Sequence, residues 1–174
     1  MKIVVLAMFT LCSFQSYATF FPKVVDNLEL ESYLGKWYQI ASTNPSFQKD
    51  CVCVTAEYEV NESENVNVTN SCNKETIDGE LEVVVGEAKK TRNPAKFNVS
   101  FGGFSLPFSN YWIVDLADDY SYAVVSSPFR TPIWILSRTP EMDEEVYTDI
   151  VDRLAKRFFD VGKLVPTTQI GCDN

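Results

Sequence analysis

Short segments in which apolar and polar residues alternate follow one another along most of the chain. In residues 52–60, valine, alanine and tyrosine at the even positions alternate with cysteine, threonine and glutamate at the odd ones. A period of two is typical of a strand with one buried face. Residues 61–65 are polar and predict a turn, and the alternation resumes at Val66 and Val68. The pattern therefore predicts a β-hairpin.

Further short apolar segments follow at roughly regular spacing. They cover residues 81–85, 97–101, 111–116, 122–125 and 133–136. Clusters of turn-forming residues separate them: Asp78-Gly79, Asn93-Pro94, Gly102-Gly103, Asp118-Asp119 and Ser127-Pro128. With a first strand near residues 35–41, eight short strands without intervening helices indicate an antiparallel barrel or sandwich.

Near the end of the chain the hydrophobic period changes. Val146, Ile150, Val151, Leu154 and Phe158 recur at helical spacing after an acidic first turn, which suits the helix dipole. This pattern predicts one amphipathic helix that packs on the outside of the sheet. Pattern alone leaves a filled sandwich and a hollow calyx open.

The first residues are typical of a secretory signal peptide. Lys2 precedes an apolar run over residues 3–11, and Ser16-Tyr17-Ala18 forms a small-x-small cleavage site. The apolar run is too short to span a bilayer. We therefore expect a signal peptide at residues 1–18, a single domain at residues 19–174 and a secreted, extracellular protein.

Charge and cysteine content narrow the function. The formal net charge is −9, which argues against nucleic acid as a partner because phosphate binding needs a basic field. Cys51, Cys53, Cys72 and Cys172 remain after the signal peptide, and an even number in an oxidising compartment predicts two disulfides among three pairings. Their spacing is not that of zinc ligands, so no metal is expected.

The chain contains no histidine. This excludes Ser-His-Asp and Cys-His catalysis and an imidazole base near neutral pH. The acidic residues are mostly single or lie in polar turns, and their spacing indicates no catalytic pair. We expect a protein that is not an enzyme, with no catalytic residues and no cofactor.

Three blocks of sequence resemble the lipocalin family. Gly35-Lys36-Trp37-Tyr38 is similar to the Gly-x-Trp signature on the first strand of that family. Residues 118–125 resemble its second signature and residues 134–140 its third. The blocks occur in the family's order over almost the whole chain beyond residue 18, and they are most similar to the branch of apolipoprotein D and the bacterial lipocalins.

This resemblance implies an eight-stranded up-and-down barrel that is open at one end, with the helix on its side and a short ninth strand near residues 164–168. The loops 44–50, 73–79, 102–110 and 127–131 would surround the open mouth. The resemblance also gives Gly35, Trp37 and Arg138 a structural role at the closed end, where the guanidinium stacks on the indole.

Strand parity then suggests which side chains line the interior. Val54, Ala56 and Tyr58 should point inward because Glu57 and Glu59 must meet water. Alternation alone favours an ordinary filled core, and the resemblance shifts the balance toward a cavity. The expected ligand contacts are Tyr38, Phe47, Tyr58, Phe97, Val99, Phe101, Phe104, Phe108, Tyr111, Trp112, Val124, Arg130 and Trp134.

The function that follows is the binding and transport of a small hydrophobic ligand, such as a fatty acid, a lysophospholipid or a similar lipid. A bilin or carotenoid carrier would use the same calyx. The loop 102–109 is unusually apolar, so a protein-interaction role through this loop is the other alternative. The same loop suggests contact with a membrane or lipoprotein surface. The oligomeric state does not follow from the sequence.

The disulfide pairing and glycosylation are two further expectations. By resemblance Cys53 pairs with Cys172, which leaves Cys51 with Cys72. Parity places Cys51 and Cys72 on opposite faces, so this pairing needs a bulge, and the exchange of Cys51 and Cys53 is the alternative. Glycosylation is expected at the sequons of Asn61, Asn67 and Asn98.

Overall fold

The computed structural model describes residues 20–103 and 106–172, and the expected signal peptide lies outside the described residues. Eight strands follow one another before the main helix. They are β1 (Gly35–Ser42), β2 (Cys51–Val60), β3 (Val66–Lys74), β4 (Leu81–Lys90), β5 (Lys96–Phe101), β6 (Tyr111–Leu116), β7 (Tyr122–Ser126) and β8 (Ile133–Ser137). All eight expected segments form strands, and β4 extends five residues beyond the predicted segment.

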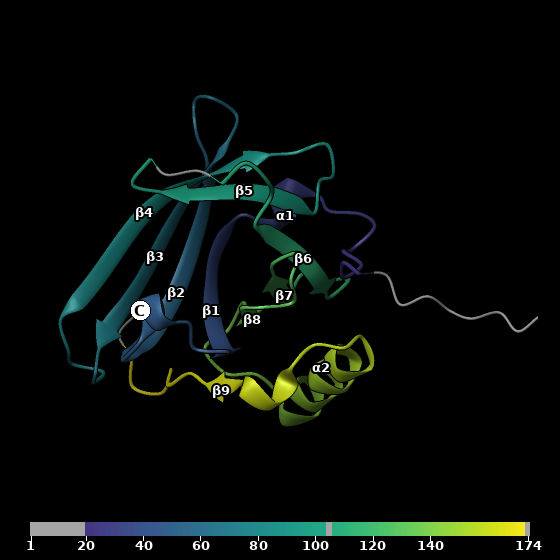
Figure 1. The fold of residues 1–174 in the computed structure, drawn as a ribbon. Helices are drawn as coiled ribbons and strands as arrows, with labels where there is room; N and C mark the ends of the chain where they lie inside the picture. Colours follow the sequence, from purple (N-terminus) through teal and green to yellow (C-terminus); the bar gives the residue numbers. More distant parts are fainter. Residues whose placement is uncertain (1–19, 104–105, 173–174) are drawn as a thin grey trace, which may run out of the picture.

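The strands form a closed antiparallel barrel. Each strand pairs with the next one along the chain, and β1 pairs with both β8 and β2. A ninth strand, β9 (Val165–Pro166), lies beside Ala41 and Ser42 of β1. The eight-stranded up-and-down barrel is thereby confirmed. The strands β2, β3 and β4 are long and lean away from the rest of the barrel (Figure 1).

Helix α2 (Glu144–Lys156) packs on the side of the barrel, as its amphipathic pattern predicts. It begins after Asp143, whose carboxylate accepts hydrogen bonds from the backbone N–H groups of Glu145 and Val146. Its buried residues are Ile150 and Leu154. A shorter helix, α1 (Leu30–Tyr33), precedes β1, and two single 3-10 turns cover Ser46–Gln48 and Val161–Lys163. Among the described residues, no helix is both long and apolar enough to cross a membrane.

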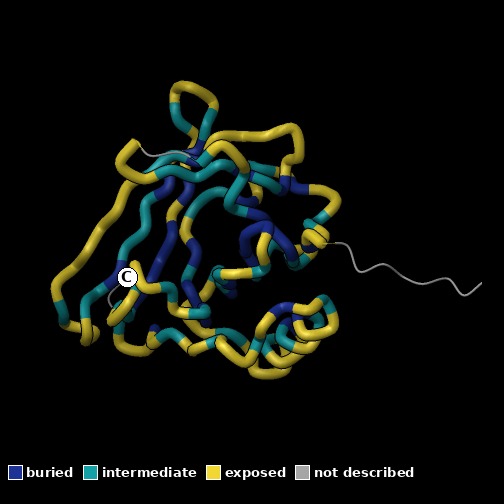
Figure 2. Tube along the Cα trace, in the orientation of Figure 1, coloured by how far each residue is buried: buried dark blue, intermediate teal, exposed yellow. Residues whose placement is uncertain are grey.

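Two apolar clusters define the two faces of the barrel wall. Trp37, Tyr58, Phe97, Ile113, Val125 and Leu136 belong to the inner cluster. Trp112, Val114, Val124, Ile133 and Ile135 belong to an outer cluster that also contains Ile150 and Leu154 of helix α2. The outer faces of β6, β7 and β8 are therefore largely apolar because helix α2 packs against them. The helix is buried on its side toward the barrel and exposed on the other (Figure 2).

The closed end is held by Trp37 and Arg138. The indole is fully buried and its Nε1 donates a hydrogen bond to the carbonyl oxygen of Tyr33 at 2.8 Å. The Arg138 guanidinium lies 3.8 Å above the ring centre and donates to the carbonyl oxygens of Lys36 and Ser32. Gly35 has a φ of +86°, and a Cβ there would come within 3.6 Å of the guanidinium.

The two disulfides are Cys51–Cys72 and Cys53–Cys172. This is the pairing that the resemblance implied. The pairing of β2 with β3 shifts register between Val52 and Thr55, and Cys53 has a φ of +54°. The bulge places Cys51 on the same face as Cys72, which removes the conflict that simple alternation raised.

Candidate functional site

The inner wall of the barrel changes from buried to exposed along β5. Phe97 is 5% exposed, Val99 is half-buried and Phe101 is 38% exposed. On the neighbouring strand β4, exposure of the inward side chains rises in the same direction, from Ala88 at 5% to Val84 at 42%. Because residues at a spacing of two share one face, each row is a continuous apolar surface that leads from the closed end to solvent.

Gly86 lets the two rows meet closely. It lies opposite Phe101 in the β4–β5 register. A Cβ at this position would come within 2.6 Å of the Phe101 ring and within 2.5 Å of the Ser100 carbonyl oxygen. The ring of Phe101 therefore lies over the backbone of Gly86, where only glycine leaves enough space.

Strand pairing is short on the side of β4 and β5. The pairing of β4 with β5 ends at Gly86 and Phe101. β5 and β6 are paired at only two positions, Lys96 with Trp112 and Phe97 with Tyr111. The first half of β4 is exposed on both faces, with Val83 and Val85 outward and Val84 inward. Solvent thus reaches the inner surface of β4 in the half that leads to the mouth.

Side-chain amides hold the opposite wall of the mouth. Gln48 donates to Gln39 at 2.7 Å and accepts from the Trp134 indole at 3.1 Å. Gln39 donates in turn to Thr167 at 2.7 Å. The buried Gln169 amide bridges the carbonyl oxygens of Gln39 and Val54, so it joins β1 to β2 where these strands diverge.

Three tyrosines meet at the closed end of the interior. The Tyr111 hydroxyl lies 2.6 Å from that of Tyr33 and 2.9 Å from that of Tyr58. Burial is the main cause that raises the pKa of all three phenols, and it raises the pKa of Tyr58 to about 12. A small cavity of about 10 Å³ is lined by these tyrosines together with Val66, Ala88, Phe97 and Val99.

The structure brings six of the expected ligand contacts to the interior. These are Tyr58, Phe97, Val99, Phe101, Tyr111 and Trp134. Phe47 and Phe108 lie exposed on the mouth loops, with Phe47 beside Trp134 and Phe108 beside Phe129. Phe104 lies outside the described residues.

Three expected contacts face outward instead. Trp112 packs between Lys96 and Phe21. The Nζ of Lys96 lies 3.5 Å from a ring centre of the indole. Val124 belongs to the cluster beneath helix α2. Tyr38 lies between the inward side chains of Trp37 and Gln39, so it is on the outer face of β1. The inward orientation expected for Trp112, Val124 and Tyr38 was wrong. On β1 the exposed Lys36 shares a face with Tyr38 and marks it as the outer one. A bulge between Ile113 and Asp115 reverses the alternation on β6, and β7 has no charged residue to mark its outer face.

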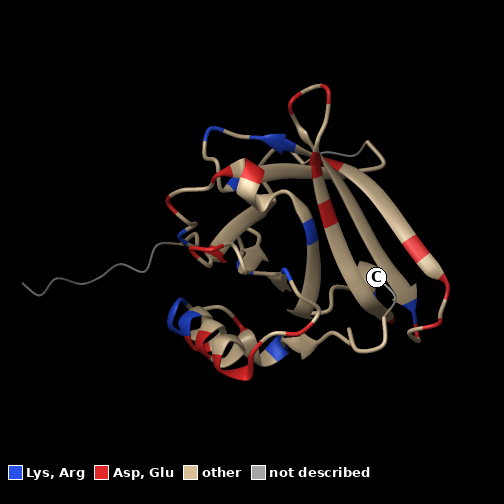
Figure 3. Cartoon of the chain, turned by 180° about the vertical axis from the view of Figure 1, so that it is seen from behind, with Lys and Arg blue, Asp and Glu red and all other residues tan. Residues whose placement is uncertain are grey.

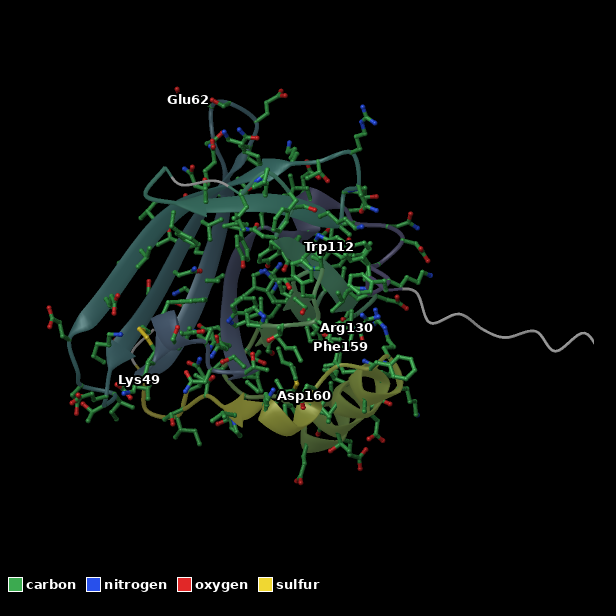
Figure 4. The ribbon with its side chains drawn as sticks, in the orientation of Figure 1. Lys49, Glu62, Trp112, Arg130, Phe159 and Asp160 are labelled. Carbon is green, nitrogen blue, oxygen red and sulfur yellow. A yellow bond between two sulfur atoms is a disulfide. The ribbon has the colours of Figure 1, made fainter. Side chains whose placement is uncertain are left out.

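Arg130 does not point to the mouth either. Its Nε donates to the carbonyl oxygen of Arg157, and an Nη donates to that of Phe20. The guanidinium lies 5.8 Å from the ring centre of Phe159, beside the end of helix α2 (Figure 4). Arg130 therefore joins the N-terminal segment and the helix end, and the expected contact with a ligand head group is not supported by its position.

Several interior residues escaped the sequence analysis. Tyr33 lies on α1, outside any strand, so parity gave no signal for it. Gln39 and Val84 share faces with Trp37 and Gly86, and alternation on β1 and β4 would have placed both inside. Gln48 lies in the 3-10 turn between β1 and β2, where alternation gives no signal.

One group of potential metal ligands is formed by Cys51, Cys72 and Glu82. Their ligand atoms lie within 4.8 Å of one another. The two sulfur atoms are joined in a disulfide, so neither is a free thiolate. Lys74 also forms an ion pair with Glu82 at 2.7 Å. These contacts favour a structural role for the group.

A closed eight-stranded barrel with a solvent-reached apolar interior, a flanking helix and an Arg over a Trp at its closed end is the architecture of a calyx-type binding protein. The chain belongs to the lipocalin family: residues 28–169 match the family model described as Lipocalin-like domain. This confirms the resemblance that the three signature blocks indicated.

Relatives from distant organisms resemble the chain over most of its length. It is 38% identical to apolipoprotein D of Rattus norvegicus over 162 residues, which cover 87% of this chain and 82% of the relative. It is 34% identical to temperature-induced lipocalin-1 of Arabidopsis thaliana, over 84% and 82% of the two chains. Identity to the outer membrane lipoprotein Blc of Escherichia coli K12 is 31%, over 85% and 83%.

Solved structures support the fold. Apocrustacyanin C1 superimposes with a TM-score of 0.66 at 21% identity, over 83% of this chain and 82% of the other. Insecticyanin from the tobacco hornworm Manduca sexta gives a TM-score of 0.63 at 21% identity, over 84% and 83%. Members of the lipocalin family are binding and transport proteins and not enzymes.

Proposed function

We propose that the protein binds a small hydrophobic ligand in its barrel and carries it outside the cell, with a fatty acid, a lysophospholipid or a similar membrane-derived lipid as cargo. One observation carries this proposal. The inner row Phe97, Val99 and Phe101 forms an apolar path from the closed end to solvent. It lies beside the inner row of Ala88, Gly86 and Val84 on the neighbouring strand β4.

Burial of apolar surface supplies the driving force. Removing apolar area from water is worth about 25 cal/mol per Å², so a chain that loses about 200 Å² of exposed surface gains about 5 kcal/mol before the cost of ordering it. No covalent step is needed. The exposed half of β4 gives the ligand a route past Phe101 to the interior.

Two observations support an extracellular site of action. Disulfides persist mainly in oxidising compartments, and the described chain has two of them. The chain is also 38% identical to rat apolipoprotein D over most of its length. The expected signal peptide at residues 1–18 would direct the chain to this compartment.

The mouth also supports contact with a lipid surface. Phe47, Phe108 and Phe129 are exposed on three loops of the open end. Aromatic side chains in the headgroup region of a membrane or lipoprotein would place the open end of the barrel against its source of ligand. Membrane contact is thus part of the proposed transport cycle.

The decisive experiment compares two neighbouring positions on β4. Val84 faces the interior and Val85 faces outward at 62% exposure. Each is changed to Asp, and binding of a fluorescent fatty acid is titrated. Val84→Asp should weaken binding at least 10-fold because a carboxylate would enter the apolar path. Val85→Asp is the matched control and should stay within about 2-fold of the unchanged protein.

Equal effects of the two substitutions would contradict binding inside the barrel. Native mass spectrometry of the protein purified from its source would then identify the cargo. A bound lipid would support the proposal, whereas a chromophore with visible absorbance would favour a pigment carrier. An empty barrel that also rejects the fatty-acid probe would rule out lipid transport.

A further inference from the structure

The three tyrosines at the closed end form a connected group that comes from three separate elements. Tyr33 lies on α1, Tyr58 on β2 and Tyr111 on β6. Their rings are also in contact: the ring centres of Tyr33 and Tyr58 are 5.6 Å apart and those of Tyr58 and Tyr111 are 6.1 Å apart. We call Tyr33, Tyr58 and Tyr111 the tyrosine trio.

The trio has more hydrogen-bond donors than it uses. Each phenol carries one hydrogen, so the three hydroxyls have three. Only two hydrogen bonds join them, Tyr33 to Tyr111 and Tyr58 to Tyr111. Whichever oxygen donates in each pair, one hydrogen remains without an acceptor inside the trio. Among the described residues, no other group is hydrogen-bonded to these three oxygens.

The trio borders a small cavity in the interior. All three members of the trio line the cavity of about 10 Å³. This volume corresponds to about one water-sized group. The other lining residues, Val66, Ala88, Phe97 and Val99, are apolar and offer no side-chain acceptor. The cavity therefore combines one available O–H donor with an apolar wall.

The phenols keep their hydrogens at physiological pH. Burial raises the pKa of Tyr33 and Tyr111 well above the ordinary value and that of Tyr58 to about 12. Arg138, the cation that acts electrostatically on Tyr33 and Tyr58, stacks on Trp37 and donates to backbone carbonyl oxygens. A carboxylate in the cavity would thus be buried without an ion-pair partner, which is costly. A neutral acceptor oxygen avoids this cost.

We propose that the tyrosine trio is a subsite for a neutral carbonyl oxygen at the leading end of the ligand. A ketone, aldehyde or ester oxygen enters the cavity and accepts the unused phenol hydrogen. The apolar remainder of the ligand lies along Val99 and Phe101 toward the mouth. This inference rests on the proposed function and narrows it: among membrane-derived lipids it favours those with a neutral carbonyl at the end that enters first, whereas a fatty acid would keep its carboxylate at the mouth.

Ligand pairs that differ by one oxygen test the subsite. Tridecan-2-one and tridecane have the same chain length, and each is used to displace a fluorescent fatty-acid probe. The protein should bind the ketone about 3- to 10-fold more tightly, the effect of one neutral hydrogen bond. The variant with Tyr33→Phe, Tyr58→Phe and Tyr111→Phe should lose this preference and keep its affinity for tridecane.

Two further variants test whether the ketone preference depends on a free phenol hydrogen and not on a general change in structure. Tyr38→Phe removes a hydroxyl on the outer face of β1 and should leave the preference unchanged. Tyr111→Phe removes the shared central hydroxyl and frees the hydrogens of both Tyr33 and Tyr58. It should therefore retain the ketone preference even though it breaks both hydrogen bonds of the trio. A purely structural trio would give no ketone preference to retain.

The infrared spectrum provides a test that needs no variant. The carbonyl stretch of tridecan-2-one labelled with ¹³C should fall in frequency on binding, relative to the same ketone in an alkane, because the oxygen accepts a hydrogen bond. An unshifted band, or equal affinities for ketone and alkane, would overturn the subsite while transport still stands. If neither compound nor the probe binds, the proposed function fails as well.

Discussion

Arg138 and Trp37 form the joint that closes one end of the barrel. The guanidinium carbon lies 3.8 Å above the centre of the indole, although the two residues are far apart in sequence and belong to opposite ends of the strand series. Arg138 also donates to the carbonyl oxygens of Lys36 and Ser32, at 2.9 and 2.7 Å. One side chain thus connects the end of β8 to α1 and to the start of β1.

Replacement of Arg138 should destabilise the fold without a direct effect on the ligand. Arg138→Ala removes a cation and ring contact and two backbone hydrogen bonds, and we expect a loss of about 2 to 3 kcal/mol in the free energy of unfolding. Arg138→Lys keeps the charge and should recover less than half of this loss, because an ammonium lacks the planar fork. Denaturant unfolding measures both variants.

Truncation of Trp37 should cost more. The indole is fully buried and contacts Tyr33 at 5.1 Å between ring centres. Trp37→Ala should therefore lower the free energy of unfolding by about 3 to 5 kcal/mol. Binding of a fatty-acid probe should persist below the lowered melting temperature. Lost binding at an unchanged melting temperature would show that Trp37 is a ligand contact and not part of the frame.

The sequence predicted the faces of β2 and β5 because charged or polar residues mark one side of each strand. Glu57 and Glu59 must meet water, and their neighbours Ala56 and Tyr58 do point inward. β6 carries one charged residue, Asp115, which faces outward and pairs with Arg153 of helix α2. A register shift between Ile113 and Asp115 breaks the alternation, so counting from Asp115 places Trp112 on the wrong face. β7 and β8 carry no charged residue. Helix α2 covers the outer face of all three strands, so Trp112 is as apolar as an inward residue and its orientation depends on a tertiary contact.

The tyrosine trio shows the same limit for the candidate site. Alternation placed Tyr58 inside correctly, and Tyr111 was an expected contact. Tyr33 lies on a helix of four residues before the barrel begins, and its hydroxyl reaches Tyr111 only through the closed-end packing. A contact between residues 78 positions apart has no signature in either local segment.

The two disulfides should contribute unequally to stability. Cys53–Cys172 spans 119 residues and Cys51–Cys72 spans 21. In the chain-entropy model, cross-links of these spans are worth about 5 and about 3 kcal/mol. Paired Cys→Ala substitutions at 53 and 172 should therefore lower the unfolding free energy more than those at 51 and 72. The reverse order in denaturant unfolding would show that local packing dominates.

Two sequons should respond differently to the same substitution. Asn67 is exposed on the outer face of β3, whereas Asn61 accepts hydrogen bonds from the backbone N–H groups of Ser63 and Asn65. We expect a glycan at Asn67 after expression in a eukaryotic secretory host, so Asn67→Gln should remove one glycan mass.

The comparison of stability must use protein expressed in bacteria, where the glycan is absent. There Asn67→Gln should leave the melting temperature nearly unchanged. Asn61→Gln should lose about 1 kcal/mol because the longer side chain cannot hold the turn. Equal losses for both substitutions would contradict a turn-holding role of Asn61.

Alkaline pH should destabilise the fold through the tyrosine trio. Burial raises the pKa of these phenols in the folded state above the ordinary value of 10.0, and that of Tyr58 to about 12. A folded state that holds a proton more tightly than the unfolded state is fully stabilised below the unfolded pKa. That stabilisation is lost as the pH rises from about 10 through the folded pKa, by up to about 1.4 kcal/mol per pH unit for each phenol.

The unfolding free energy should therefore be nearly constant between pH 8 and 9.5 and should fall steeply above pH 10. Denaturant unfolding at each pH measures this curve, and absorbance near 295 nm should show that the trio ionises only as the protein unfolds. The variant with Phe at positions 33, 58 and 111 has no phenol to ionise in this place. Its stability should fall less steeply above pH 10, and equal slopes for the two proteins would assign the alkaline loss to other groups.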